Sequence, residues 1–245
     1  MVQHEADDDA GRTTDETDTS AALVDRLRAL ATDDQRVKYR RFFPGDDSFL
    51  GVRMGDVFDL AKQHLDLPVD DLERLLDRDE HEARVLACSI MGKSAAHRRT
   101  TDERRADLYD LYLRRHDRID TWDLVDLAAR DVVGRRLVDR DRDELRRLAA
   151  SAFWPERRTA LVATFAFIAH DDLDDAFELS ATLADDDAPF VQKAVGWVLR
   201  TAGDRDPGRL TAFVESRAAK MPRDALRAAI EKLPKVERAR ILAIR

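Results

Sequence analysis

A degenerate repeat of about 33 to 40 residues is the feature that most constrains the fold of this 245-residue chain. Five segments each begin with a polar or proline-bearing turn and continue into an alanine-rich stretch with apolar residues at helical spacing. They are residues 81–95, 121–137, 154–169, 189–203 and 221–234. Taking Glu82, Trp122, Glu156, Val191 and Asp224 as equivalent positions gives spacings of 40, 34, 35 and 33 residues. Further helical stretches lie between these segments, at 172–185 and 209–220.

Two helices in each period of this length are typical of a HEAT-like helical-repeat solenoid, and the sequence predicts an all-α fold of that kind. Since one helix pair cannot bury its apolar face alone, neighbouring pairs must stack into a curved superhelix. We expect the alanine-rich helices to line its concave, basic inner face. Pro155, Pro189 and Pro222 are predicted to lie in first helical turns, where a missing N–H is tolerated. Only 9 glycines and 7 prolines leave few turns for an all-β fold.

The chain divides into two predicted parts, an acidic disordered tail over 1–20 and a single HEAT-like repeat domain over 21–245. The tail has no apolar periodicity, and its seven acidic residues face one base, Arg12. The first part of the domain is expected to hold shorter helices and one turn, at Pro44 and Gly45. These helices are predicted over residues 22–31, 33–43, 55–65 and 69–77.

The net charge of −8 is concentrated in the tail, which carries −6 and leaves −2 for the remaining 225 residues. That nearly neutral body contains clusters of basic residues. They are Lys38, Arg40 and Arg41; Arg98 and Arg99; Arg104 and Arg105; Arg114, Arg115 and Arg118; and Arg135 and Arg136. Such a body can present one basic face to a nucleic acid. Taken alone, each cluster is better explained as a solvated helix face paired with the many aspartates.

The sequence contains no pattern of a metal site, a disulfide or a membrane span. Cys88 is the only cysteine, and the six histidines are scattered. The N-terminus lacks the pattern of a signal peptide, and the longest apolar run, 160–169, is about half of a membrane span. We therefore expect a soluble, cytoplasmic protein without a metal.

Trp122, Asp126 and Arg130 are spaced four residues apart, which places them on one face of a helix. Asp123 has a structural explanation in the first helical turn, where the helix dipole favours an acid, and Asp120 or Thr121 is predicted to cap that helix. Asp126 lies beyond this turn. An exposed ion pair with Arg130, worth about 0.3–0.5 kcal/mol, is one explanation for it. A site facing a substrate is the other.

Two other inner helices carry further candidates. Lys193 and Arg200 flank Trp197 on one face, and Gly196 in the same helix permits the close approach of a neighbouring helix or a ligand. In the segment 154–160, Arg158 precedes a line of apolar residues on the same helix face, and this position would place it at the entrance of the inner groove. Its guanidinium can bind a phosphate through two hydrogen bonds.

With these residues together, the chain resembles the AlkD-like DNA alkylation repair glycosylases, a family built of HEAT-like repeats. The matching stretches are FLGVR (49–53), HEAR (81–84), TWDLVD (121–126), WPERR (154–158), VQKAVGWVLR (191–200) and MPRDALRAAIEKLP (221–234). The resemblance implies a monofunctional glycosylase that excises positively charged alkylpurines, such as 7-methylguanine and 3-methyladenine, from duplex DNA. It also implies an open groove that works without full capture of the base and without a cofactor. The protein is expected to be a monomer without an obligate protein partner, and to be associated with the nucleoid when it is bound to DNA.

Carried over residue by residue, the resemblance implies that Asp126 is the catalytic carboxylate and that Trp122 and Trp197 face the lesion. Arg158 takes the place of the phosphate-contacting arginine, and Tyr39 that of a tyrosine near the N-terminus. We expect three further groove residues, Arg157, Lys193 and Arg200, to bind DNA.

The chemistry fits these residue types. An alkylated purine that already carries a positive charge is a good leaving group, and one carboxylate can stabilise the resulting oxocarbenium ion and orient water. Indole faces bind cations, at about 0.5–2 kcal/mol each. The alternative is a noncatalytic HEAT-like scaffold that binds DNA or protein through the same face. A plain protein adaptor would bury its tryptophans in the core.

Affinity for undamaged duplex DNA is predicted to fall as salt rises, because phosphate contacts release counterions. A series of binding titrations over increasing chloride concentration measures this slope. A salt-independent affinity would contradict the arginine-lined groove.

Overall fold

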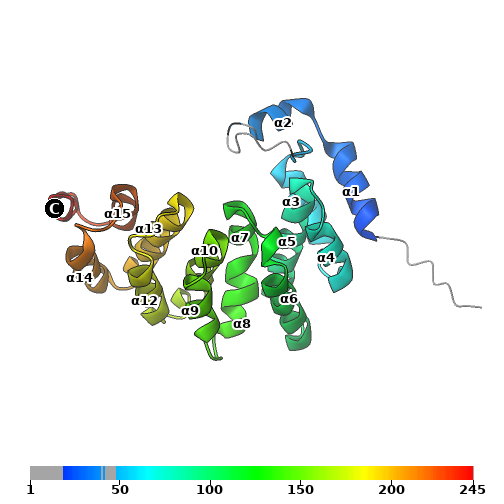
Figure 1. Ribbon diagram of the computed structural model, residues 1–245. Coiled ribbons are helices and arrows are strands. Elements are labelled where there is room, and N and C mark those ends of the chain that lie inside the picture. The colour runs from blue at the N-terminus through cyan, green and yellow to red at the C-terminus, as the bar shows by residue number, and fades with distance from the viewer. Residues whose placement is uncertain (1–18, 40, 42–47, 245) are drawn as a thin grey trace, which may run out of the picture.

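The computed structural model describes residues 19–39, 41 and 48–244, and this part of the chain is built of helices with no strand. The helices form a curved helical-repeat solenoid of two rows (Figure 1). The inner row consists of α3 (Met54–Gln63), α5 (His81–Ala96), α7 (Trp122–Ala128), α10 (Trp154–Ala163), α13 (Pro189–Gly203) and α15 (Arg223–Ala229). The outer row consists of α4 (Val69–Leu76), α6 (Asp102–Arg114), α9 (Asp143–Ala149), α12 (Asp174–Thr182) and α14 (Pro207–Arg217).

The remaining elements lie at the ends of the solenoid or continue its inner helices. Helices α1 (Thr19–Leu30) and α2 (Asp33–Tyr39) begin the described part, and α16 (Lys235–Leu242) ends it. The short helix η1 (His116–Arg118) follows α6, the π-helix η2 (Ala129–Gly134) and α8 (Arg135–Leu137) follow α7, and α11 (Phe165–Ile168) follows α10. Residues 1–18 of the predicted acidic tail lie outside the described residues, and so does the predicted turn at Pro44 and Gly45.

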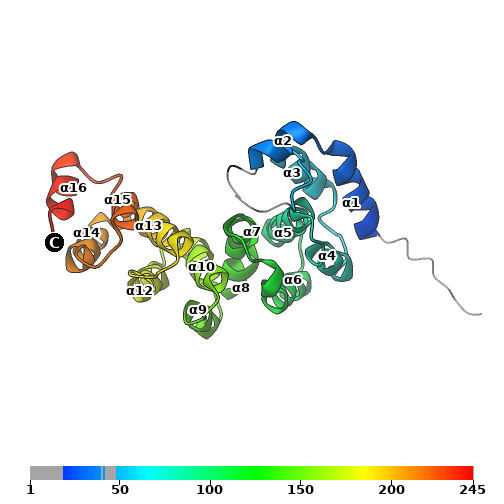
Figure 2. The same cartoon turned by 45° about the horizontal axis from the view of Figure 1, so that its top comes forward.

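The inner row lines the concave side of the superhelix (Figure 2). Each inner helix packs against the next, and a hydrophobic core runs through the repeats from Leu23 to Ile241. Because an inner helix is covered by two inner neighbours and by outer helices, little of it reaches solvent; only Lys93 and Ala96 of α5 are not buried. Small side chains let helices approach in this way, so the alanine-rich pattern belongs to the inner row, as predicted.

The main differences from the predicted helices lie in three inner segments, 121–137, 154–169 and 221–234. The segment 121–137 is not one α-helix, because it changes to a π-helix at Ala129. The segment 154–169 breaks at Thr164, whose hydroxyl donates to the carbonyl of Leu161 at 2.6 Å and competes with the helical hydrogen bonds. Pro155 and Pro189 lie in first turns as expected, whereas Pro222 precedes the first residue of α15.

Glycines set the closest contacts along the inner row. A Cβ atom on Gly92 of α5 would lie 2.2 Å from the carbonyl oxygen of Leu127 in α7. A Cβ on Gly134 would lie 2.2 Å from the carbonyl oxygen of Ala163 in α10, and one on Gly196 2.8 Å from that of Ala225 in α15. For Gly196, the close approach expected from the sequence is therefore that of a neighbouring helix.

Gly92→Ala is predicted to lower the free energy of unfolding by about 1–3 kcal/mol, because the added methyl group forces two packed backbones apart. The matched control is Gly55→Ala, since a Cβ at Gly55 meets no atom within 4 Å. That change is expected to raise stability by about 0.4–1 kcal/mol. Urea denaturation of both variants measures the two shifts, and an equal rise in stability for both would contradict the close contact.

Candidate active site

Asp126 on α7 and Arg158 on α10 form a bidentate ion pair between consecutive repeats. The Arg158 Nε donates to Oδ1 of Asp126 at 3.0 Å, and its Nη2 donates to Oδ2 at 2.8 Å. The third nitrogen, Nη1, donates to the backbone carbonyl of Phe190 at the start of α13. The Arg158 side chain is only 5% exposed, whereas that of Asp126 is 22% exposed. The guanidinium is thus surrounded by protein, and part of the carboxylate remains open.

This pair rules out one of the explanations that the sequence left open for Asp126, the ion pair with Arg130. The ion-pair partner of Asp126 is Arg158, and within the described residues Arg130 has no ion pair. Arg130 is exposed and lies in the π-helix, where the α-helical four-residue register with Asp126 is lost. The predicted phosphate contact of Arg158 stays a prediction, because its hydrogen bonds go to Asp126 and Phe190.

Asp123, one turn before Asp126, has different partners. Its Oδ2 lies 2.7 Å from Nε2 of His81, and its Oδ1 accepts from the hydroxyl of Thr121 at 2.6 Å. Thr121 is the N-cap residue of α7, as one of the two predictions had it, but its side chain makes no capping hydrogen bond, because its hydroxyl donates to Asp123. Asp120 accepts from Arg84 at 2.6 Å. Asp123 is therefore a fixed structural carboxylate that joins α7 to α5.

The two carboxyl groups of α7 are shifted in opposite directions. Burial raises the pKa of the Asp126 carboxyl above its ordinary value, and Arg158 offsets only part of that effect. Burial acts on Asp123 as well, but the hydrogen bonds with His81 and Thr121 hold the pKa of that carboxyl below its ordinary value. Asp126 is thus the carboxyl that protonates first as the pH falls.

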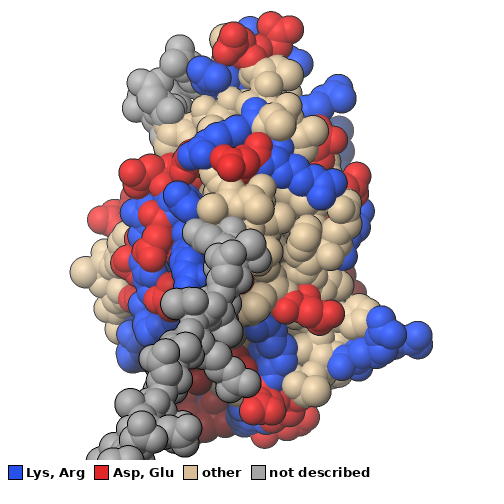
Figure 3. Space-filling model, turned by 90° about the vertical axis from the view of Figure 1, so that its right-hand side faces the viewer, with Lys and Arg blue, Asp and Glu red and all other residues tan. Residues whose placement is uncertain are grey.

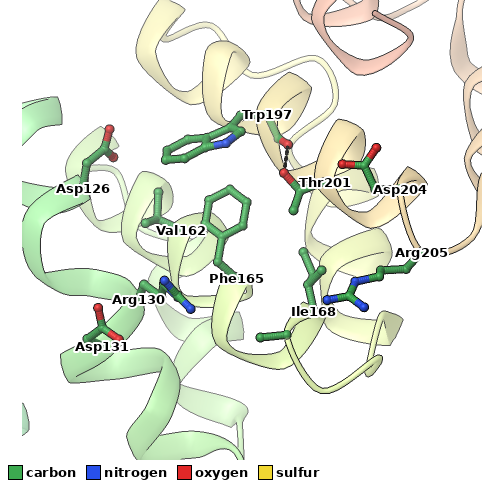
Figure 4. Close-up of a pocket in the computed structure, with 11 residues that line it drawn as sticks. Asp126, Arg130, Asp131, Val162, Phe165, Ile168, Trp197, Thr201, Asp204 and Arg205 are labelled. Atoms are coloured by element: carbon green, nitrogen blue, oxygen red, sulfur yellow. Dashed lines mark hydrogen bonds between the residues drawn. The ribbon is translucent and has the colours of Figure 1, made fainter. Parts of the chain in front are cut away.

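Asp126 lines two cavities that open on either side of α7. The first, called here the Trp197 cavity, has a volume of about 550 Å³. Its lining includes Trp197 and Phe165, whose ring centroids are 4.4 Å apart, with Arg130 and Asp131 at the edge (Figure 4). In Figure 4 Asp126 and Trp197 lie on the same side of the cavity, above Val162. Trp197 is 36% exposed, so its ring is available to a ligand.

The second cavity, called here the Trp122 cavity, has a volume of about 430 Å³ and an almost wholly apolar lining. Besides Asp123 and Asp126 it is lined by Tyr39, Phe49, Met54, Phe58, Val85, Trp122 and Leu127. The Tyr39 hydroxyl donates to the carbonyl of Val52 at 2.6 Å, which turns the ring toward this cavity. The structure therefore brings Tyr39, Trp122 and Asp126 together. The candidate N-terminal tyrosine and the candidate carboxylate thus line the same cavity, and the role of Tyr39 stays a prediction.

Aromatic rings continue from Trp122 along the starts of the inner helices. Phe190 lies between Trp122 and Trp154, with centroid distances of 6.3 and 5.2 Å and nearly parallel rings. Phe190 and Trp154 were not among the predicted site residues. The sequence did contain a signal for them, because both residues lie at the start of an inner helix, as Trp122 does.

Glu82 is a further residue that the sequence reasoning used only as a repeat marker. It is buried, and its carboxylate accepts from the backbone N–H groups of Leu50, Gly51 and Val52 at 2.8–3.0 Å. Gly51 has a φ of 97°, a conformation that favours glycine. Glu82 thus holds the segment that supplies Phe49 and the hydrogen-bond acceptor of Tyr39.

The other predicted DNA-binding residues lie in varied surroundings. Lys193 is exposed, with its Nζ 5.2 Å from the centroid of the Phe190 ring. Arg200 is in an ion pair with Glu231. Arg157 is 13% exposed and binds both carboxylate oxygens of Asp186, at 2.6 and 3.0 Å. The structure therefore leaves Lys193 open to solvent and engages both arginines. Their roles in DNA binding stay predictions.

Positive and negative side chains are interspersed on the end of the molecule that begins with α1 (Figure 3). Several predicted basic clusters are paired in this way: Arg114 and Arg115 with Glu73, and Arg136 with Asp102. Within the described ranges, no group of three or more His, Cys, Asp or Glu side chains could hold a metal ion. In the same ranges, no helix is long and apolar enough to cross a membrane.

The fold and this grouping define a helical-repeat protein whose inner row presents one carboxylate between two aromatic-lined cavities. The chain belongs to the DNA alkylation repair enzyme family, whose model matches residues 23–233. It is an enzyme of alkylated-DNA repair, with DNA as its substrate.

Among solved structures, the chain is similar to one described as a predicted DNA alkylation repair enzyme from Enterococcus faecalis. The sequence identity is 18% and the TM-score 0.64, with 84% of this chain and 98% of that chain covered. At that identity the likeness shows the shared fold alone. No curated protein matches the chain.

The Asp126 carboxyl is predicted to titrate above the ordinary aspartate pKa of about 3.9, and the Asp123 carboxyl below it. Carbon-13 NMR of protein labelled at the aspartate carboxyls measures both midpoints, with Asp126→Asn and Asp123→Asn spectra to assign the signals. An Asp126 midpoint below that of Asp123 would contradict the arrangement described here.

Proposed function

We propose that this enzyme is a monofunctional DNA glycosylase that hydrolyses the N-glycosidic bond of positively charged alkylpurines, of the 7-methylguanine and 3-methyladenine type. The observation that carries the proposal is the position of Asp126. Its carboxylate is partly exposed, lines two cavities and is held in place by both side-chain nitrogens of Arg158 that face it.

In this proposal Asp126 acts on the sugar and not on the base. As the bond to the charged purine breaks, the electron pair leaves with the base, which becomes neutral, and positive charge develops on the deoxyribose. A carboxylate beside the sugar stabilises that charge and accepts a proton from the attacking water. The leaving base needs no general acid, because it already carries the positive charge.

Arg158 orients the carboxylate and favours its ionised form, against the effect of burial. An aromatic ring on each side, Trp122 in one cavity and Trp197 in the other, offers a π face to the cationic lesion or sugar. Asp126 and Trp197 are both partly exposed, which supports recognition without full capture of the base. Membership of the family supports DNA as the partner. We propose that the enzyme acts as a monomer and without a cofactor.

The test is release of free base from a duplex containing 7-methylguanine, with the wild type compared with Asp126→Asn under single-turnover conditions. Asparagine keeps the shape but not the charge, so we expect the excision rate to fall by about 10²–10³-fold. If the wild type releases no base, the glycosylase proposal is wrong. Full activity of the variant would show that Asp126 is misassigned.

Loss of one partner from a buried ion pair also destabilises the fold, so the comparison needs a matched control. Asp175→Asn removes a carboxylate that is 7% exposed and pairs with Arg142 between α12 and α9, in the outer row. We expect this variant to lose stability but to keep its excision rate. The noncatalytic scaffold remains as the alternative, and it predicts DNA binding without release of base by any variant.

A further inference from the structure

Four arginines at the turn between α5 and α6 differ from the paired clusters elsewhere. Within the described residues, Arg98, Arg99, Arg104 and Arg105 have no ion pair, although Arg114, Arg115 and Arg118 in the same helix pair and its extension do. Arg98 and Arg99 are exposed. A group of guanidinium ions without carboxylate partners is a surface that attracts anions.

The turn that carries these arginines is held by hydrogen bonds to backbone carbonyls. Arg105 donates to the carbonyls of Ala95 and His97, both at 3.0 Å, and Arg104 donates to that of Leu67 at 2.5 Å. The Thr100 hydroxyl donates to the carbonyl of Ser94 at 2.6 Å. The turn is therefore fixed on its scaffold, so the charges of Arg98 and Arg99 stay at one place on the surface.

A hollow of about 460 Å³ lies against this turn. Its lining includes Arg99, Arg104, His97, Thr100 and Thr101, with Asp66 as the one acidic residue among them. Asp102, the next acid in the chain, is already engaged by Arg136 and Arg140. Two guanidinium ions against one carboxylate leave the hollow positive, and the Thr101 hydroxyl, which accepts from the backbone N–H of Arg104, can donate its hydrogen to a phosphate oxygen.

The same contacts place the turn on one edge of the solenoid together with the Trp197 cavity. Arg136 and Arg140 follow η2 at the end of α7, so their bonds to Asp102 bring that end beside the α5–α6 turn. Arg130 and Asp131 of η2 line the Trp197 cavity, together with Phe165 and Ile168 of α11. Val85 of α5 lines the Trp122 cavity together with Asp126, and from Val85 the helix runs on to its end at Ala96, about 16 Å at 1.5 Å per residue.

We propose that Arg98, Arg99 and Arg104 form a phosphate-binding surface that holds the backbone of the substrate duplex at a distance from the lesion. That distance of about 16 Å corresponds to about five base pairs at 3.4 Å per base pair. The surface itself requires only that DNA is the substrate. Its distance from the lesion rests on the proposed function, which places the lesion beside Asp126.

The test is the salt dependence of binding to duplexes that carry a stable abasic analogue and differ in the length of each arm. In the double variant Arg98→Ala/Arg99→Ala, both side chains removed are exposed and unpaired. With arms of about ten base pairs, we expect the slope of log affinity against log salt to fall by about two. When the arm on one side is cut to three base pairs, the variant and the wild type should have equal slopes.

The matched control is Arg146→Ala/Arg147→Ala, a second pair of adjacent arginines on α9 of the outer row, which removes the same charge. We expect its slope to equal that of the wild type. An unchanged slope for Arg98→Ala/Arg99→Ala on long duplexes would overturn the proposal, and so would an equal fall on all arm lengths. Base release is measured separately: if none occurs but the slope on long undamaged duplexes still falls by two, the glycosylase proposal fails and the surface stands.

Discussion

The ion pair between Asp126 and Arg158 is the interaction on which the candidate site depends. Removing two charges from water costs several kcal/mol for each ion, and the attraction between them repays this only when the geometry is good. Here each carboxylate oxygen of Asp126 accepts a hydrogen bond from one nitrogen of Arg158, and the third nitrogen of Arg158 donates to the Phe190 carbonyl. These contacts join α7, α10 and α13, so three repeats fix the direction in which one carboxylate points.

The position of α7 is itself set by close contacts along the inner row. Gly92 on α5 approaches the carbonyl of Leu127, the residue after Asp126, and Gly134 approaches α10 on the other side. The backbone that carries Asp126 therefore lies between two contacts that leave no space for a side chain. This packing keeps both cavities open beside Asp126, because the helices meet through backbone and small residues instead of large side chains.

Some features of the site could be predicted from the sequence because they depend on local spacing. Residues four apart share a helix face, so Trp122 and Asp126 could be placed together, and the five similar segments could be assigned to one row of helices. The charge partners could not be predicted in this way. Arg130 is close to Asp126 in sequence, yet the partner is Arg158, which is 32 residues away and one repeat along.

The amino-acid sequence by itself determined the helical-repeat class and the segments that form the inner row, because apolar periodicity and repeat length are properties of the chain. The tertiary structure alone decided which arginines are paired and which are free, where a helix changes from α to π, and that two cavities meet at one carboxylate. Each of these results from contacts between repeats. Such contacts depend on how closely the helices approach, and no spacing along a single helix contains that information.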